Sequence, residues 1–162
     1  MYIAYLLLGS NLGDRISYIK QAKELIQIIC GNIIQQSSIY ETAAWGIEEQ
    51  PSFYNQAVIL KTTLLPEELM QYLLNIEETI GRIRTIKYGP RIIDIDIQLI
   101  DELIINTPLL SLPHPLLVDR KFALMPLAEI APQLKHPVLN KTILELQKEC
   151  RDSLGIIKLE TQ

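Results

Sequence analysis

Two carboxylates separated by one residue follow directly on a cluster of cations in the middle of this chain. The apolar run Ile92–Ile100 carries Asp94 and Asp96. Residues 81–91 before it hold four cations and no acidic residue: Arg82, Arg84, Lys87 and Arg91. Side chains alternate between the two faces of a strand, so a strand here points both carboxylates the same way.

This arrangement predicts a site for a magnesium–nucleotide complex. Two like charges on an apolar strand repel each other, and Mg²⁺ would relieve the repulsion, since it takes one or two carboxylates together with substrate phosphates. The neighbouring cations are the groups that polyphosphate oxygens need. A simpler interpretation stays open from spacing alone, in which Asp94 and Asp96 are the solvated face of an amphipathic strand and the cations form a solvated loop.

The alternation also makes an expectation for the other residues of this strand. Gln98 is expected beside the carboxylates on the solvated side of the sheet. The opposite, apolar face is expected to carry Ile93, Ile95, Ile97 and Leu99.

The chain as a whole has the composition of an ordinary soluble globular protein. It has 162 residues, 48% hydrophobic and 21% charged, and we expect a single domain over residues 1–162. The net charge of −4 argues against a general nucleic-acid-binding protein, so the local basic cluster suits a small polyanion better. The apolar start, Met1–Leu8, is too short and lacks a basic flank for a signal peptide or membrane span. We therefore expect a cytoplasmic protein without nucleic-acid or membrane partners.

The two cysteines, Cys30 and Cys150, do not suggest a metal site. Neither lies in a C-x-x-C pair or near a histidine, which argues against zinc. Two free thiols in a reducing compartment are the expectation.

The elements expected up to residue 100 follow the order β-α-β-β-α-β. The strands are expected at Tyr2–Leu8, Ile33–Tyr40, Phe53–Thr63 and Ile92–Ile100, and the helices at 15–30 and Pro66–Ile80. This is the ferredoxin-like arrangement, an α+β fold with an antiparallel sheet and two helices on one face. The segment Glu41–Ser52 is long for a connection, which is typical of a lid. Added to this core we expect a short strand near Leu103–Ile105, a helix at Asp119–Ile130 interrupted by Pro126, and a last helix at about Thr142–Cys150.

A series of short motifs, in order from residue 9 to residue 132, points to one family. The motifs are Gly9–Asp14, Tyr40–Thr42, Gln50-Pro51 with Phe53 and Asn55, Gly81-Arg-x-Arg84, Lys87–Ile97, Leu112–His114 and Pro126–Pro132. Together they resemble the 6-hydroxymethyl-7,8-dihydropterin pyrophosphokinase family of folate biosynthesis. The ferredoxin-like core agrees with the fold of that family.

The resemblance implies a transfer of pyrophosphate from ATP, in which the pterin's hydroxymethyl oxygen attacks the β-phosphorus and AMP leaves. Two magnesium ions would bridge the triphosphate, with Asp94 and Asp96 as their protein ligands. Arg82 and Arg91 match positions that stabilise the transferred group. Asp96 could also take the hydroxyl proton, and a purely electrostatic mechanism is an equal alternative.

The resemblance further assigns binding residues for both substrates. Phe53 and Phe122, the only phenylalanines of the chain, match the two rings that sandwich the pterin, and Asn55 and Thr42 match positions at its edge. The lid positions expected against the pterin are Ala43, Ala44 and Trp45. The positions expected to bind ATP are Glu77, Arg84, Lys87, Ile97, Ser111, His114 and Arg120.

This sequence departs from the family pattern at several positions, and two other functions remain to be weighed. The departures are Ala44 and Trp45 in the lid, Leu74, Gln98 and Pro115. A palm-type nucleotidyl transferase would also use acidic strand residues and two metals, but no third downstream acid lies in a clear motif. An RNA-binding module on this fold would need stacking aromatics on its central strands, where this chain has aspartates. The resemblance favours a monomer.

Overall fold

Strand β1 (Tyr2–Ser10) lies inside an antiparallel sheet, between β4 (Phe53–Thr62) and β5 (Asp94–Ile100). The computed structural model describes residues 1–47 and 49–159; Glu48 of the expected lid and residues 160–162 lie outside it. The strand order is β5-β1-β4-β3-β8, and β2 also pairs with β4. The further strands are β2 (Asn32–Gln36), β3 (Tyr40–Thr42) and β8 (Ile156–Lys158).

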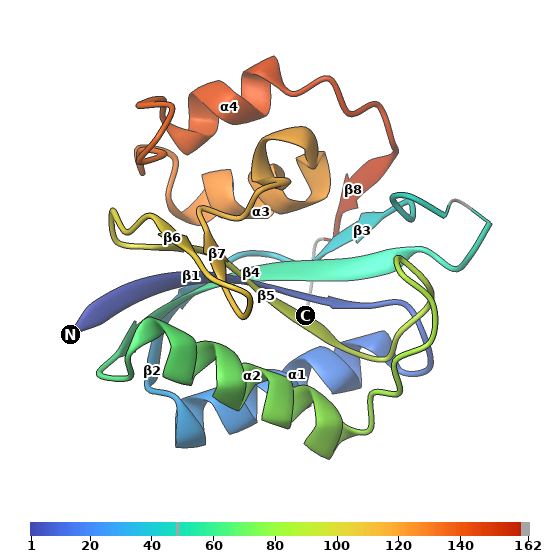
Figure 1. Ribbon diagram of the computed structural model, residues 1–162. Helices are drawn as coiled ribbons and strands as arrows, with labels where there is room; N and C mark the ends of the chain where they lie inside the picture. Colours follow the sequence, from blue (N-terminus) through green and yellow to red (C-terminus); the bar gives the residue numbers. More distant parts are fainter. Residues whose placement is uncertain (48, 160–162) are drawn as a thin grey trace.

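Helices cover both faces of this sheet (Figure 1). On one face, α1 (Arg15–Ile29) and α2 (Pro66–Ile80) enclose a core that includes Leu6, Leu60 and Leu73. On the other face, α3 (Lys121–Ile130) and α4 (Ile143–Glu149) enclose a second core around residues such as Leu124. The molecule is therefore a mixed α/β structure with three layers.

Local sequence explains where the helices begin and end. Asp14 caps α1, and its carboxylate accepts a hydrogen bond from the Ser17 amide. Pro66 opens α2, and Gly81 ends it with φ of 118°, a left-handed conformation that glycine adopts without steric cost. The predicted bounds of α2 are confirmed. They could be predicted because a proline marks one end of the helix and a glycine the other.

Other predicted elements differ from the structure. The expected strand Ile33–Tyr40 is two strands, β2 and β3, since Ser37 replaces ladder bonds with its side chain: its Oγ accepts from the Ala57 amide at 3.0 Å. The expected lid consequently starts after Thr42. The short strand predicted near Leu103–Ile105 is β6 (Ile105–Asn106), paired with β7 (Ser111–Leu112).

The helix predicted at Asp119–Ile130 begins later and is not interrupted by its proline. A short 3₁₀ turn, η1 (Leu117–Asp119), precedes α3, which continues through Pro126. A proline here removes one helical hydrogen bond. The burial of Leu124, Leu127 and Pro126 itself against the sheet explains why the helix persists.

Strand β5 contains one residue without a partner on β1. Tyr5 pairs with Leu99 and Leu6 with Ile97, so Gln98 is the additional residue. Leu99 is thereby turned toward α3, and the prediction that it shares the face of Ile97 is wrong. The prediction that Gln98 lies on a solvated side is also wrong, because it is 2% exposed.

Among residues 1–47 and 49–159, no helix combines the length and the hydropathy needed to span a membrane.

Candidate active site

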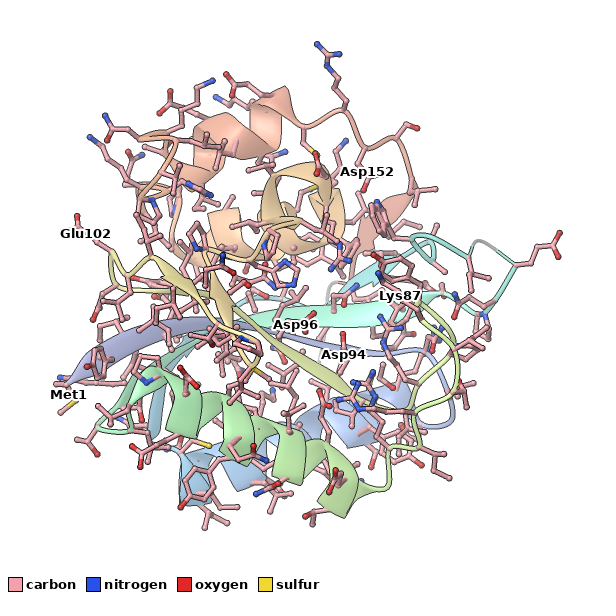
Figure 2. The ribbon with its side chains drawn as sticks, viewed as in Figure 1. Met1, Lys87, Asp94, Asp96, Glu102 and Asp152 are labelled. Atoms are coloured by element: carbon pink, nitrogen blue, oxygen red, sulfur yellow. The ribbon has the colours of Figure 1, made fainter. Side chains whose placement is uncertain are left out.

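The two carboxylates of β5 lie on the α3 side of the sheet, where the strand enters it (Figure 2). Asp94 pairs with Gly9 and Asp96 with Leu7 of β1. Between them, Ile95 points into the core under α1 and α2, as the alternation predicted. The sheet thus holds two acids on one face at a fixed two-residue spacing.

Arginines from the preceding loop neutralise the first of these acids. Arg82 Nη1 donates to Asp94 Oδ1 at 2.7 Å, and Arg91 Nε lies 3.6 Å from Oδ2. Burial alone would raise the pKa of Asp94, but Arg91 and Arg82 outweigh it and lower the value. The pKa of Asp96 is raised well above its usual range by burial and by the charge of Asp94. Asp96 is therefore the acid that gains most from a cation at this position.

The donor set fits a hard cation that is completed by a substrate. Asp94 and Asp96 offer only oxygen atoms, the donors that Mg²⁺ prefers. In the part of the chain that the structure describes, no group of three or more histidine, cysteine, aspartate and glutamate side chains could hold a metal ion. Two carboxylates without further protein ligands leave coordination positions for water and phosphate oxygens.

Glu77, a buried residue of α2, forms ion pairs with two of the arginines. It is 2% exposed, and its Oε1 accepts hydrogen bonds from Arg82 and Arg84, both at 3.0 Å. Its Oε2 accepts from the Ile95 amide at 2.7 Å. Burial and the charge of Asp94 raise the pKa of Glu77 to about 7, although Arg82, the Ile95 amide and Arg84 lower it. Glu77, expected at the nucleotide, thus positions two cations from inside the protein.

Residues 82–91 form one wall of an open cleft of about 500 Å³. The opposite wall comes from His114, Leu116 and Arg120, and the floor from the two carboxylates. Of the residues expected to bind ATP, those that line this cleft are Arg84, Lys87, His114 and Arg120. Glu77, Ile97 and Ser111 do not line it: Ile97 is buried in the core, and Ser111 lies in β7.

His114 enters the cleft as a neutral side chain. Its amide donates to Gln98 O at 2.9 Å, and its Nδ1 accepts from the Leu116 amide at 3.1 Å. Burial and the nearby Arg120 lower the pKa of His114 to about 4. Because Nδ1 is an acceptor, the proton of the neutral ring lies on Nε2, which makes His114 a hydrogen-bond donor.

A second, narrower cavity lies beside the cleft, with a free volume of about 20 Å³. It is lined by almost all the residues expected to bind the pterin: Thr42, Ala43, Trp45, Phe53, Asn55 and Phe122. Ala44 is not among its lining residues and is 2% exposed. Asn55 Nδ2 donates to Thr42 Oγ1 at 2.8 Å, which fixes the amide at the cavity edge.

Gly9 is required beside this amide. A Cβ at this position would lie 2.7 Å from Asn55 Oδ1, so a larger residue would push the amide away. The sequence analysis identified Gly9–Asp14 as a family motif but did not predict that Gly9 leaves room for the Asn55 amide.

Arginine side chains cover both phenylalanine rings of the narrow cavity. The guanidinium carbon of Arg91 lies 4.8 Å from the centre of the Phe53 ring, and that of Arg120 lies 5.5 Å from Phe122. Arg120 also lies 4.7 Å from the Trp45 ring. These cation–π contacts stabilise the guanidinium groups next to the carboxylates.

Tyr88 contributes to both cavities, and the sequence analysis did not single it out. It packs edge-on against Trp45, with ring centres 5.5 Å apart, and its φ is 61°. It is the one aromatic residue of segment 81–91 and directly precedes Gly89-Pro90. An aromatic residue at that position of a basic loop was the feature of the sequence that could have indicated a binding role for Tyr88.

Asn11 joins the two loops that surround the site, and it was also missed. Its Oδ1 accepts from the Arg91 amide at 2.8 Å, while its Nδ2 donates to Gln50 Oε1 at 2.9 Å and to Pro51 O at 3.0 Å. Gln50 Nε2 in turn donates to Tyr88 O at 2.8 Å. The end of β1 therefore ties segment 43–52 to segment 82–91.

The two cavities meet at the carboxylates. The residues that line both are Tyr88, Arg91, Asp94, Asp96 and Arg120. A flat ligand in the narrow cavity and a polyanion in the cleft would therefore touch at a point surrounded by two acids and two arginines.

Comparison with known proteins identifies the family of this chain. The sequence model described as 7,8-dihydro-6-hydroxymethylpterin-pyrophosphokinase matches residues 5–132. The chain is 45% identical to the 2-amino-4-hydroxy-6-hydroxymethyldihydropteridine pyrophosphokinase of Aquifex aeolicus, over 92% of either chain. It is 46% identical to the Bacillus subtilis protein of that name, over 82% of this chain and 80% of that protein.

Solved structures agree at the level of the fold. The wild-type Plasmodium falciparum HPPK-DHPS chain crystallised with pteroate is similar over 91% of this chain, with a TM-score of 0.76 and 19% identity. This chain spans 44% of the length of that larger protein. One family model matches most of the sequence, and two relatives are at least 45% identical over most of their length. These matches are sufficient to assign the chain to a family. The chain belongs to the 7,8-dihydro-6-hydroxymethylpterin-pyrophosphokinase family.

Proposed function

We propose that this chain transfers pyrophosphate from ATP to the hydroxymethyl oxygen of 6-hydroxymethyl-7,8-dihydropterin, a step of folate biosynthesis. The observation that carries the proposal is the meeting of an aromatic cavity and a basic cleft at Asp94 and Asp96. The narrow cavity has the aromatic and amide groups for a flat heterocycle, and the cleft has the charge for a triphosphate. The reacting atoms of the two substrates would meet between them.

The narrow cavity binds the pterin. Phe53 and Phe122 supply ring faces for stacking once their arginines move toward phosphate, and Asn55 and Thr42 meet the polar edge of the ring. The amide of Asn55 can donate and accept, as an edge that carries both kinds of group requires. This cavity orients the hydroxymethyl group toward the carboxylates.

The cleft binds the triphosphate of ATP. Arg84 and Lys87 stand at its open side, and neutral His114 offers a donor on the opposite wall. Phosphate oxygens compete with Glu77 and Asp94 for the guanidinium groups of Arg82, Arg84 and Arg91. Arg82 and Arg91 are then available to the group that is transferred.

Asp94 and Asp96 would hold magnesium, and we infer two ions. Magnesium bound to the triphosphate neutralises charge that develops on the attacking and leaving oxygens. In the reaction the pterin oxygen forms a bond to the β-phosphorus, the bond from that phosphorus to the departing AMP oxygen breaks, and the hydroxyl proton passes to Asp96 or to solvent water. The protein contributes positioning and fixed positive charge, which dominate phosphoryl-type transfers.

We also propose that the sheet is a ferredoxin-like core within a single domain. The pairing of β4 with β1 and β2, and of β1 with β5, supports this assignment. All these pairs are antiparallel, and α1 and α2 each connect two strands of the sheet that are separated by one other strand.

Product analysis tests the activity directly. The protein is incubated with ATP, Mg²⁺ and 6-hydroxymethyl-7,8-dihydropterin, and the nucleotides are separated. AMP that forms only with the pterin present is the expected result. ADP would indicate an ordinary kinase, released pyrophosphate a nucleotidyl transferase, and either outcome would overturn the proposal.

A further inference from the structure

Helix α3 begins without a capping side chain of its own. Its N-cap position is Arg120, which makes no side-chain cap hydrogen bond. Arginine carries five donors and no acceptor, so it cannot satisfy the free amides of a first helical turn. Arg120 lines both cavities, and the next residue but one is Phe122. Arg120 thus lines the site from the N-cap position, where a helix normally carries Ser, Thr, Asp or Asn.

The missing acceptor comes from a distant residue. Asp152, which follows α4, accepts a hydrogen bond from the Lys121 amide through Oδ2 at 3.1 Å. Its Oδ1 accepts from the Leu154 amide at 3.0 Å, so both oxygens are engaged. Figure 2 labels Asp152 between α4 and β8, next to α3. A carboxylate at this end of a helix is also favoured by the helix dipole.

The segment that starts at Asp152 also holds the opposite wall of the narrow cavity. Gly155 O accepts from the Ala43 amide at 2.9 Å, and β8 pairs with β3, with Ile156 opposite Thr42. Thr42 and Ala43 line the cavity together with Phe122. We term residues 152–158 the C-terminal brace. Asp152 contacts the start of α3, next to Phe122, and Gly155 and Ile156 contact Ala43 and Thr42 on the opposite wall of the cavity.

The brace lies outside residues 5–132, to which the family model matches. We propose that the C-terminal brace sets the spacing between the Thr42–Ala43 wall and the Phe122 wall, with Asp152 as a positioning residue for pterin binding. The inference rests on the proposed function for the identity of the ligand. Asp152 acts through the first turn of α3 and does not touch the substrate.

Asp152→Ala tests this role in the full-length protein. The affinity for 6-hydroxymethyl-7,8-dihydropterin is measured with Mg²⁺ and α,β-methylene-ATP, in which the bond that breaks is blocked. We expect pterin affinity to fall about fivefold, because the first turn of α3, which carries Phe122, then loses the acceptor that fixes its start. The affinity for the nucleotide should fall less: of the residues expected to bind it, Arg120 lies at the start of α3, whereas Arg84, Lys87 and His114 reach the cleft from elements that the brace does not hold.

Two further variants make the result decisive. Asp152→Asn keeps an acceptor for the Lys121 amide and should restore most of the pterin affinity. Glu149→Ala, which removes a carboxylate whose partner is the exposed Lys141, should leave both affinities unchanged. If Asp152→Ala does not fold, Asp152→Ser, whose hydroxyl is a shorter acceptor, takes its place, and its pterin affinity should fall more than its nucleotide affinity and more than that of Asp152→Asn.

Several outcomes would overturn the inference. They are a lowered melting temperature with unchanged pterin affinity, equal losses for pterin and nucleotide, and no rescue by Asp152→Asn. Wild-type protein that binds no pterin would instead refute the proposed function.

Discussion

The narrow cavity and the open cleft are adjacent, but they are built in different ways. The narrow cavity takes its walls from strands β3 and β4 and from the first turn of α3, and its polar pair, Asn55 and Thr42, is already hydrogen-bonded. The cleft takes one wall from segment 82–91, whose arginines are paired with Glu77 and Asp94. Strands and one helix thus supply most of the narrow cavity, while Trp45, Tyr88 and Arg91 close it from the two loops. The cleft instead holds its charge in internal ion pairs that a polyanion can replace.

Removal of the acid shared by both cavities should have the largest effect. Asp96→Ala should reduce AMP formation about a thousandfold, since it removes a metal ligand at the reacting centre. The fold should survive, because the variant relieves the repulsion between two neighbouring acids. Glu102→Gln, on an exposed carboxylate just beyond β5, is the matched control. Near-normal activity of Asp96→Ala would contradict the site assignment.

Arg91 should show that charge at the junction serves turnover more than binding. Arg91→Ala is expected to lower kcat about a hundredfold, the usual consequence of losing a group that stabilises transition-state charge. The pterin dissociation constant should change much less, despite the contact of Arg91 with Phe53. Lys61→Ala, at an exposed position of β4, controls for net charge. A loss confined to pterin affinity would refute this role.

Asn11 tests whether the two loops act as one unit. Asn11→Ala should lower kcat/KM about tenfold, because the half-buried Gln50 side chain and Arg91 amide lose their hydrogen-bond partner. Gln50→Ala should have a similar effect, and the double variant should be little worse than either single one. Kinetics of the three variants measure this coupling, with Asn32→Ala as an exposed asparagine control. Strictly additive losses would show that the loops are independent.

The smallest effects are expected from a pair of variants that distinguishes pterin binding in the narrow cavity from ATP binding in the cleft. Phe53→Leu should weaken pterin binding about fivefold through lost stacking, without change for ATP. Lys87→Ala should weaken ATP binding about threefold, the size expected for an exposed ion contact, without change for the pterin. Titration of each variant with each ligand gives the four values. Equal losses for both ligands in either variant would erase the distinction between the cavities.

The parts of the fold that were predictable carry local signals. The alternation of Asp94 to Ile97 fixed their faces, and Pro66 and Gly81 marked both ends of α2. The expected pterin residues meet around one cavity with the exception of Ala44. These successes rest on backbone periodicity and on motifs that the family resemblance supplied.

The parts that were missed depend on contacts between distant segments. Nothing near Asn11 indicates that Gln50 and Arg91 converge on it, and nothing near Arg120 indicates that its helix is capped from Asp152. Strand β8 is short and mostly exposed, so it lacks a hydrophobic pattern that would predict it. The unpartnered residue of β5 likewise depends on its pairing with β1.

That unpartnered residue has a consequence for how such sites change in evolution. Without Gln98, Ile97 and Leu99 would be successive residues with the faces they have now, so the additional residue does not set which side chains face the site. It does supply the carbonyl that accepts the His114 amide and so anchors the nucleotide-side wall to the strand of the acids. A one-residue deletion could therefore preserve the core, the carboxylates and the pterin cavity and still release His114. Insertions and deletions, and not only substitutions, are changes by which nucleotide binding could diverge from pterin binding on this sheet.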